Sequence, residues 1–190
     1  MPSFDELYRA IEALPPGLTG EILEPGVIRT MGRPGGKHRL TARGIARSLS
    51  GDDRWEGGTG WWLEQEAEIR IRDRLVVPDL SGWRLPEGHA IPPPFVFVNP
   101  IVELPDWCCE VLSDSTRKID RDIKVPLYAE SGIEWIWLVD PDERCVEVLH
   151  VRNGRAELLE RLEGAVQRTI APFTSLVDTS RWWVEPPEAT

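Results

Sequence analysis

The fold of this chain is decided by two short apolar stretches, WCCEVL at residues 107–112 and IEWIWLV at residues 133–139. Both are β-prone and continuously apolar, which is typical of interior strands covered on both faces. Residues 120–131 between them are partly helical in pattern and follow cap-forming residues at 113–116. A strand, a helix and a strand in this order favour a parallel pair joined by a right-handed crossover. The sequence therefore predicts an α/β fold.

Residues 3–31 predict a helix followed by a hairpin. Ser3 and Glu6 have the spacing of a capping box, and apolar residues then recur at helical intervals until Pro15-Pro16. Residues 20–31 carry apolar pairs on both sides of Pro25-Gly26, a strong turn dipeptide. An N-terminal helix and a β-hairpin are therefore expected before the central sheet.

A second helix is expected from about residue 37 to residue 49. Its buried stripe is predicted to consist of Leu40, Ile45, Ala46 and Leu49. Its outer side carries a row of arginines four residues apart, namely Arg39, Arg43 and Arg47. Such a row is either a solvated face or a surface that contacts phosphates, and the pattern leaves both interpretations open.

Strands are expected at residues 62–72 and 75–83, with a turn at Asp73-Arg74 between them. The many prolines of residues 85–105 make regular structure improbable, so a long surface excursion is expected there. Near the C-terminus, Asn153-Gly154 lies between two alternating stretches and predicts a β-hairpin.

The composition fits one intracellular domain. A chain of 190 residues that is 41% apolar can build one core but not two, so residues 1–190 are expected to form a single domain. The sequence has neither an apolar run long enough to cross a bilayer nor a secretion signal, so a cytoplasmic protein is expected. The three cysteines, two of them adjacent, favour reduced packing residues over disulfides or a zinc site.

The charge is strongly uneven along the chain. A formal net charge of −10 argues against a generic nucleic-acid binder, which neutralises phosphates with Lys and Arg. Residues 27–50, however, contain six basic residues and no acidic ones, so this stretch carries +6 and the remainder −16. Local charge, not the total, would steer a polyanion.

Two of the expected strands carry a carboxylate where an apolar residue would pack better, Asp79 in LVVPDLSGW and Glu110 in WCCEVL. Burying an ionised carboxylate is costly unless it is paired or binds a metal. If the two strands are neighbours, the carboxylates converge on an oxygen-rich site suited to Mg²⁺ or Mn²⁺. Such an ion polarises a phosphodiester and lowers the pKa of an attacking water.

These features resemble the Uma-two family, which is grouped with restriction endonucleases as a branch of the PD-(D/E)XK nuclease superfamily. The resemblance extends from about residue 20 to about residue 183. It depends on EILEPGV at 21–27, His38 at a helix start, Pro78-Asp79, Pro105-Asp106, EVLS at 110–113, the four-residue spacing of Asp120, Lys124 and Tyr128, and GIEWIWLVDP at 132–141.

The resemblance implies a restriction-endonuclease-like mixed central sheet flanked by helices, with a nuclease core at about 37–150. It also implies that Asp79 and Glu110 bind the metal and that a lysine lies two residues after Glu110. Leu112 occupies that place, so the resemblance suggests a relocated lysine, Lys124, with Lys118 as the second choice. Pro126 is expected to begin or kink the following helix, so the four-residue spacing does not guarantee a common face.

The expected activity is Mg²⁺-dependent hydrolysis of DNA phosphodiester bonds, and the family resemblance implies a homodimer. Accessory positions at the site are His38, Glu21, Asp120 and Tyr128. Leu112 and the negative net charge leave open a nuclease-derived scaffold that has lost turnover and serves as a binding or dimerisation module. Hydrolysis of a small phosphorylated substrate is a third interpretation, for which the sequence has no dedicated motif.

Overall fold

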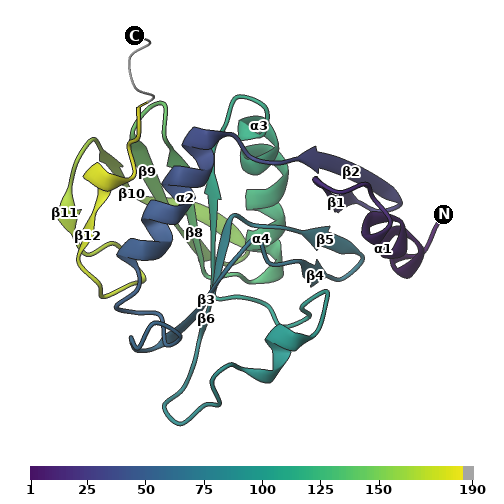
Figure 1. The fold of residues 1–190 in the computed structure, drawn as a ribbon, viewed down its shortest axis with the longest axis horizontal. Helices are drawn as coiled ribbons and strands as arrows, with labels where there is room; N and C mark the ends of the chain where they lie inside the picture. Colours follow the sequence, from purple (N-terminus) through teal and green to yellow (C-terminus); the bar gives the residue numbers. More distant parts are fainter. Residues whose placement is uncertain (186–190) are drawn as a thin grey trace.

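The parallel pair predicted from the two apolar stretches forms the centre of a six-stranded sheet in the computed structural model, which describes residues 1–185 (Figure 1). β7 (Trp107–Val111) runs parallel to β8 (Trp135–Asp140), with Trp107 opposite Trp135 and Val111 opposite Val139. All five residues of β7 are buried, as expected for an interior strand. The predicted α/β class is confirmed as a mixed sheet, because every other strand pair in it is antiparallel.

The strands form three sheets. The central sheet has the order β10-β9-β8-β7-β6-β3 and also contains β3 (Trp61–Gln65), β6 (Leu80–Arg84), β9 (Cys145–Arg152) and β10 (Arg155–Glu163). A four-stranded sheet has the order β2-β1-β5-β4 and consists of β1 (Leu18–Glu24), β2 (Val27–Gly32), β4 (Ile69–Ile71) and β5 (Arg74–Val76). A short pair is formed by β11 (Gln167–Arg168) and β12 (Val177–Asp178).

The two long strands predicted at 62–72 and 75–83 are each broken in two, and their halves belong to different sheets. The first breaks near Glu66, whose φ of 53° lies in the left-handed region. The second breaks at Pro78-Asp79, because proline has no N–H to donate to a ladder. The turn between β4 and β5 is Arg72-Asp73, one residue earlier than predicted, since Ile71 pairs with Arg74.

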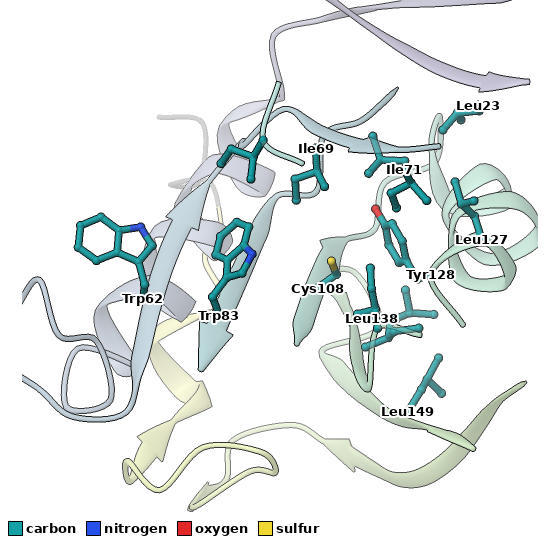
Figure 2. Packing of buried hydrophobic residues seen from close by; sticks show 14 of the residues in the cluster. Leu23, Trp62, Ile69, Ile71, Trp83, Cys108, Leu127, Tyr128, Leu138 and Leu149 are labelled. Carbon is teal, nitrogen blue, oxygen red and sulfur yellow. The ribbon is translucent and has the colours of Figure 1, made fainter. Parts of the chain in front are cut away.

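Helices cover both faces of the central sheet. α2 (Gly36–Ser48) packs against the face that carries Trp107, Cys109 and Val111. On the other face, α3 (Arg117–Ile119), a π-helical turn (Asp120–Lys124) and α4 (Val125–Ser131) form one helical segment. α4 places Leu127 and Tyr128 beside Cys108 and Leu138 in the core (Figure 2).

The buried stripe of α2 differs from the predicted one at its first position. Leu40 is 44% exposed, and Thr41 is buried together with Ile45 and Leu49. The Thr41 hydroxyl donates a hydrogen bond to the carbonyl of Trp182 at 2.8 Å, and this contact sets the rotation of the helix. Apolar spacing alone could not predict it, because the partner lies 141 residues away.

The remaining local predictions are confirmed. α1 (Phe4–Glu12) begins at a capping box formed by Ser3 and Glu6. The β9–β10 hairpin turns at Asn153-Gly154, both with positive φ, as a tight hairpin turn requires. Residues 85–105 contain no strand and one short 3₁₀ turn (Pro94–Phe97), and another such turn follows β12 (Thr179–Arg181).

The three cysteines are buried and free, as predicted. Within residues 1–185, no helix is both long and apolar enough to cross a membrane.

Candidate active site

A cleft of about 890 Å³ opens where the four-stranded sheet meets the central sheet and the N-terminal end of α2. Its floor is acidic and consists of Glu21, Asp79, Glu110 and Asp120. β1 supplies Glu21, the loop before β6 supplies Asp79, β7 supplies Glu110, and the π-helical turn supplies Asp120. Residues far apart in the sequence therefore bring these four carboxylates to one cavity, which Glu66, Glu68, Asp114 and Asp142 also line.

Glu110 occupies the centre of this floor. Alternation along β7 turns its side chain toward the face of Cys108 and Leu112, which is the face that α4 covers. Only 2% of Glu110 is exposed. The Lys124 ammonium donates to both carboxylate oxygens of Glu110 at 3.0 Å, and the Tyr128 hydroxyl donates to Oε1 at 2.5 Å. The buried carboxylate thus has a partner on each oxygen.

Lys124 is shared among several acids. Its Nζ lies 3.0 Å from Glu21 Oε1 and 3.7 Å from Asp120 Oδ1, and it also contacts the Val77 carbonyl at 3.4 Å. Burial opposes protonation of Lys124, but the charges of Glu110, Glu21 and Asp120 outweigh it and raise the pKa of this ammonium. Lys124 therefore carries its proton at neutral pH.

Two acids of the floor, Glu110 and Asp120, also hold protons more tightly than usual. Burial raises the pKa of Glu110 well above its ordinary value, and the charge of Lys124 only partly opposes this rise. Burial likewise raises the pKa of Asp120. Both shifts have the same main cause, because burial removes the water that would solvate an ionised carboxylate.

The π-helical turn explains how Lys124 reaches the floor. The Val125 N–H donates to the carbonyl of Asp120, five residues earlier, and α4 then begins with Pro126 in its first turn. Proline is tolerated there because its missing N–H has no partner to lose. The helical segment therefore continues past Pro126. Asp120, Lys124 and Tyr128 do share a face, which their four-residue spacing alone did not guarantee.

Asp79 is held from two sides. Its Oδ2 accepts a hydrogen bond from the Val111 N–H at 2.7 Å, next to Glu110 along β7. Its Oδ1 lies 2.6 Å from His38 Nε2 in the first turns of α2. Burial of His38 disfavours the imidazolium, but the hydrogen bond and charge of Asp79 outweigh burial and raise the pKa of His38. Asp79 and Glu110 thus converge on one cleft, although a loop and not a strand carries Asp79.

Glu21 has one oxygen without a partner. Its side chain is fully buried, and Oε1 accepts from the Val77 N–H at 2.9 Å while also contacting Lys124. Oε2 is buried and has no hydrogen-bond partner within residues 1–185. A buried carboxylate oxygen ordinarily has a donor or a cation beside it.

The donor set fits a hard divalent cation. Every candidate ligand is a carboxylate oxygen, and negative charges outnumber the lysine that they share. Within the described part of the chain, no three His, Cys, Asp or Glu side chains form a ready-made metal cage. Mg²⁺ does not need one, because it keeps several waters and uses one or two carboxylates. Asp79 and Glu110 would supply those ligands, beside the unpartnered oxygen of Glu21.

Comparison with known proteins decides the family. Residues 4–178 match the model of the Uma2 family, which is described as "Putative restriction endonuclease". The chain belongs to the Uma2 family. A crystal structure of a protein from Anabaena variabilis ATCC 29413, described as a putative nuclease belonging to DUF820, is similar over 97% of this chain and 100% of that one. Its TM-score is 0.71 at 20% identity, so the two share a fold. No curated protein matches the chain.

The Uma2 chain brings most of the proposed site residues together. The contacts above join Asp79 to His38 and Glu110 to Lys124 and Tyr128, and Lys124 in turn contacts Glu21 and Asp120. Lys118, the second choice for the relocated lysine, is exposed and does not line the cleft. Arg39, Arg43 and Arg47 are exposed on the outer side of α2, as predicted, but none of them lines the cleft.

Three further basic residues line the cleft and were not singled out as site residues from the sequence. They are Arg29 on β2, Arg33 after it, and Lys37 in the first turn of α2. All three belong to the positively charged stretch at residues 27–50, but the sequence alone did not show which basic residues of this stretch face the cavity. That distinction depends on the pairing of β1 with β2, in which Arg29 lies opposite Glu21.

Proposed function

We propose that this Uma2 protein is a metal-dependent endonuclease that hydrolyses phosphodiester bonds in DNA, with Asp79 and Glu110 as ligands of Mg²⁺ or Mn²⁺. The observation that carries the proposal is the contact of Lys124 with both oxygens of Glu110 at 3.0 Å. The superfamily pattern places a lysine where this chain has Leu112, and Leu112 is buried. Lys124 delivers an ammonium to the same carboxylate from the following helical segment.

The chain's own residues have distinct parts in this proposal. The Val111 N–H and His38 fix the orientation of the Asp79 carboxylate. Lys124 and Tyr128 do the same for Glu110, so both proposed ligands are positioned before any ion arrives. When bound, the metal supplies a Lewis acid for the phosphoryl oxygens and lowers the pKa of an attacking water.

Lys124 and His38 are the proton-bearing groups of the site. Lys124 keeps its ammonium, which stabilises negative charge that develops at a phosphate held in the cleft. His38 has a raised pKa, so it holds a proton at the wall of the cleft more tightly than a free imidazole does. A proton donor at this position would act as a general acid and protonate the oxygen that leaves phosphorus.

A module that has lost turnover was the main alternative, because Leu112 occupies the lysine position. The contact between Lys124 and Glu110 weakens that reason, since the ammonium is present although its position in the sequence has changed. A measurement of DNA cleavage distinguishes an endonuclease from a module that has lost turnover. DNA as the substrate belongs to the same proposal and is tested with it. A homodimer is proposed from the family resemblance, and analytical ultracentrifugation of the purified chain tests it.

Nicking of supercoiled plasmid with Mg²⁺ or Mn²⁺ tests the proposal. The wild-type chain should nick, and Asp79→Asn, Glu110→Gln and Lys124→Gln should each lower the rate by at least about 100-fold, the order found for groups that stabilise charge in a transition state. Lys118→Gln is the matched control, because Lys118 is exposed in the same helical segment. Nicking that survives both Asp79→Asn and Glu110→Gln would sink the proposal.

Calorimetry with Mn²⁺ distinguishes loss of turnover from loss of the site. A wild-type chain that binds Mn²⁺ but never nicks DNA is a binding module. A chain that does neither has no metal site, and the assignment of Asp79 and Glu110 as ligands is then wrong.

A further inference from the structure

The cleft has two walls of opposite charge. Its floor is acidic, and its opposite rim is formed by residues 29–38, which run from β2 into the first turn of α2 and contain no acidic residue (Figure 1). The basic members of this rim are Arg29, Arg33 and Lys37. A basic rim would repel a cation and so does not help the cavity to bind one. An anion that lies beside a bound cation would instead be attracted to the rim.

The strand register aims Arg29 at the cleft. Arg29 lies directly opposite Glu21 in the antiparallel pair of β2 with β1, and directly opposite residues project their side chains from the same face. Glu21 is the acid that contacts Lys124 on the floor. Arg29 therefore occupies the face of the hairpin that looks onto the site.

Arg29 and Arg33 have no partner among residues 1–185 that would neutralise their charge. Neither makes a side-chain hydrogen bond or an ion pair with any residue from 1 to 185, and Arg29 forms none within 4.0 Å even with Glu21 opposite it. By contrast, Arg70, Arg84 and Arg144 are each paired with a carboxylate. Lys37 is also paired, because its Nζ lies 2.7 Å from Asp142 Oδ1. Arg29 and Arg33 are therefore the basic residues of the rim whose charge is not neutralised by another side chain within residues 1–185.

We propose that Arg29 and Arg33 bind backbone phosphates of the DNA strand, whereas Arg39, Arg43 and Arg47 on α2 do not. This inference rests on the proposed function and assigns the substrate contacts of that site. A guanidinium offers two parallel donors to a phosphate, which a metal on the acidic floor cannot do. The rim then holds the strand while the floor holds the ion.

Binding of a fluorescently labelled duplex, measured by anisotropy in Ca²⁺ over a range of salt concentrations, tests the assignment without requiring cleavage. Arg29→Gln and Arg33→Gln should each weaken binding about tenfold and reduce the slope of log affinity against log salt by about 0.9. Arg43→Gln is the matched control, because it removes the same charge from the same basic stretch. It should stay within about twofold of wild type with an unchanged slope.

Each outcome decides the inference. Equal losses for Arg29→Gln and Arg43→Gln, or no measurable binding by the wild-type chain, overturn it. Thermal unfolding of each variant shows whether the hairpin is intact, and Arg29→Lys, which keeps the charge, should recover part of the affinity. Inorganic phosphate added at the phosphate concentration of the duplex should not displace it, because a polymer is held at several points. Displacement would overturn the assignment to a nucleic-acid backbone.

Failure here and failure of the proposed hydrolysis look different. If the chain binds duplex through Arg29 but never nicks plasmid, the phosphate-binding inference holds and the proposed endonuclease activity is wrong. A chain that nicks plasmid at the same rate with and without Arg29 and Arg33 is a nuclease whose substrate lies elsewhere.

Discussion

The hydroxyl of Tyr128 donates a hydrogen bond to Oε1 of Glu110 at 2.5 Å, inside the core and away from solvent. Figure 2 shows the Tyr128 ring among Ile71, Leu127 and Leu138, with its hydroxyl pointing toward Ile71. The ring contributes to the hydrophobic core, and its oxygen serves the acidic floor. One residue therefore couples the stability of the fold to the position of the proposed metal ligand.

Tyr128→Phe should destabilise the fold by about 1–3 kcal/mol, because it leaves a buried carboxylate oxygen short of a donor while the ring still packs. Tyr8→Phe is the matched control. Tyr8 also donates to a carboxylate at 2.5 Å, but its partner Glu68 is only half-buried and can be solvated. Urea unfolding should give a smaller loss for Tyr8→Phe. Equal losses would mean that the hydroxyl of Tyr128 has no special part in stabilising Glu110.

Lys124→Met should cost about 3–5 kcal/mol at neutral pH, because it leaves Glu110, Glu21 and Asp120 buried without their common cation. Lys118→Met, on the exposed side of the same segment, should stay within about 0.5 kcal/mol of wild type.

The loss in Lys124→Met should shrink as the pH falls. Burial already raises the pKa of Glu110 and of Asp120, and removal of Lys124 raises both further. A carboxyl whose pKa is higher in the folded than in the unfolded state binds protons on folding, so acid stabilises the folded variant relative to neutral pH. Urea unfolding of both proteins at pH 7.5 and pH 5.5 measures this. A loss that grows toward pH 5.5 would contradict the ionic explanation.

The sequence predicted the burial of Glu110 in an interior strand, because that feature depends on a local pattern. An acid inside WCCEVL has few innocent explanations, and β7 does bury Glu110 between two layers. The turn at Asn153-Gly154 was also predicted from a local pattern, because Asn and Gly readily adopt the positive φ that both residues have. These predictions succeeded because the causes lie within a few residues of the effect.

The sequence could not predict features that depend on distant contacts. The register of β1 with β2 shifts at a bulge between Glu21 and Glu24, and this shift is what places Arg29 opposite Glu21. A plain hairpin around Pro25-Gly26 would have placed Thr30 there. Burial of Thr41 in place of Leu40 likewise depends on the carbonyl of Trp182, near the other end of the chain.

The stability of the wild-type chain should also depend on pH through His38. The folded pKa of His38 is raised above its unfolded value near 6.5 by Asp79, so the protonated form is favoured by folding. This contribution is fully present below about pH 6.5 and is lost as the pH rises through the folded pKa. The free energy of unfolding of wild type minus that of His38→Gln, measured in EDTA, should therefore fall between pH 6 and pH 9. A difference that rises in this interval would show that His38 is buried as the neutral imidazole.

A divalent cation should stabilise the fold only when both proposed ligands are intact. A ligand that binds only the folded state adds about 2.7 kcal/mol at a concentration of 100 times its dissociation constant. Mn²⁺ should therefore raise the unfolding temperature of the wild-type chain but not that of Asp79→Asn or Glu110→Gln. Glu157→Gln, an exposed site on β10 outside the cleft, is the control and should respond like wild type. If Mn²⁺ raised the unfolding temperature of all four proteins equally, the cation would bind elsewhere. Glu21→Gln adds a finer test, because Oε2 of Glu21 has no hydrogen-bond partner within residues 1–185. A reduced Mn²⁺ response in this variant would identify that oxygen as a third ligand, and an unchanged response would limit the site to Asp79 and Glu110.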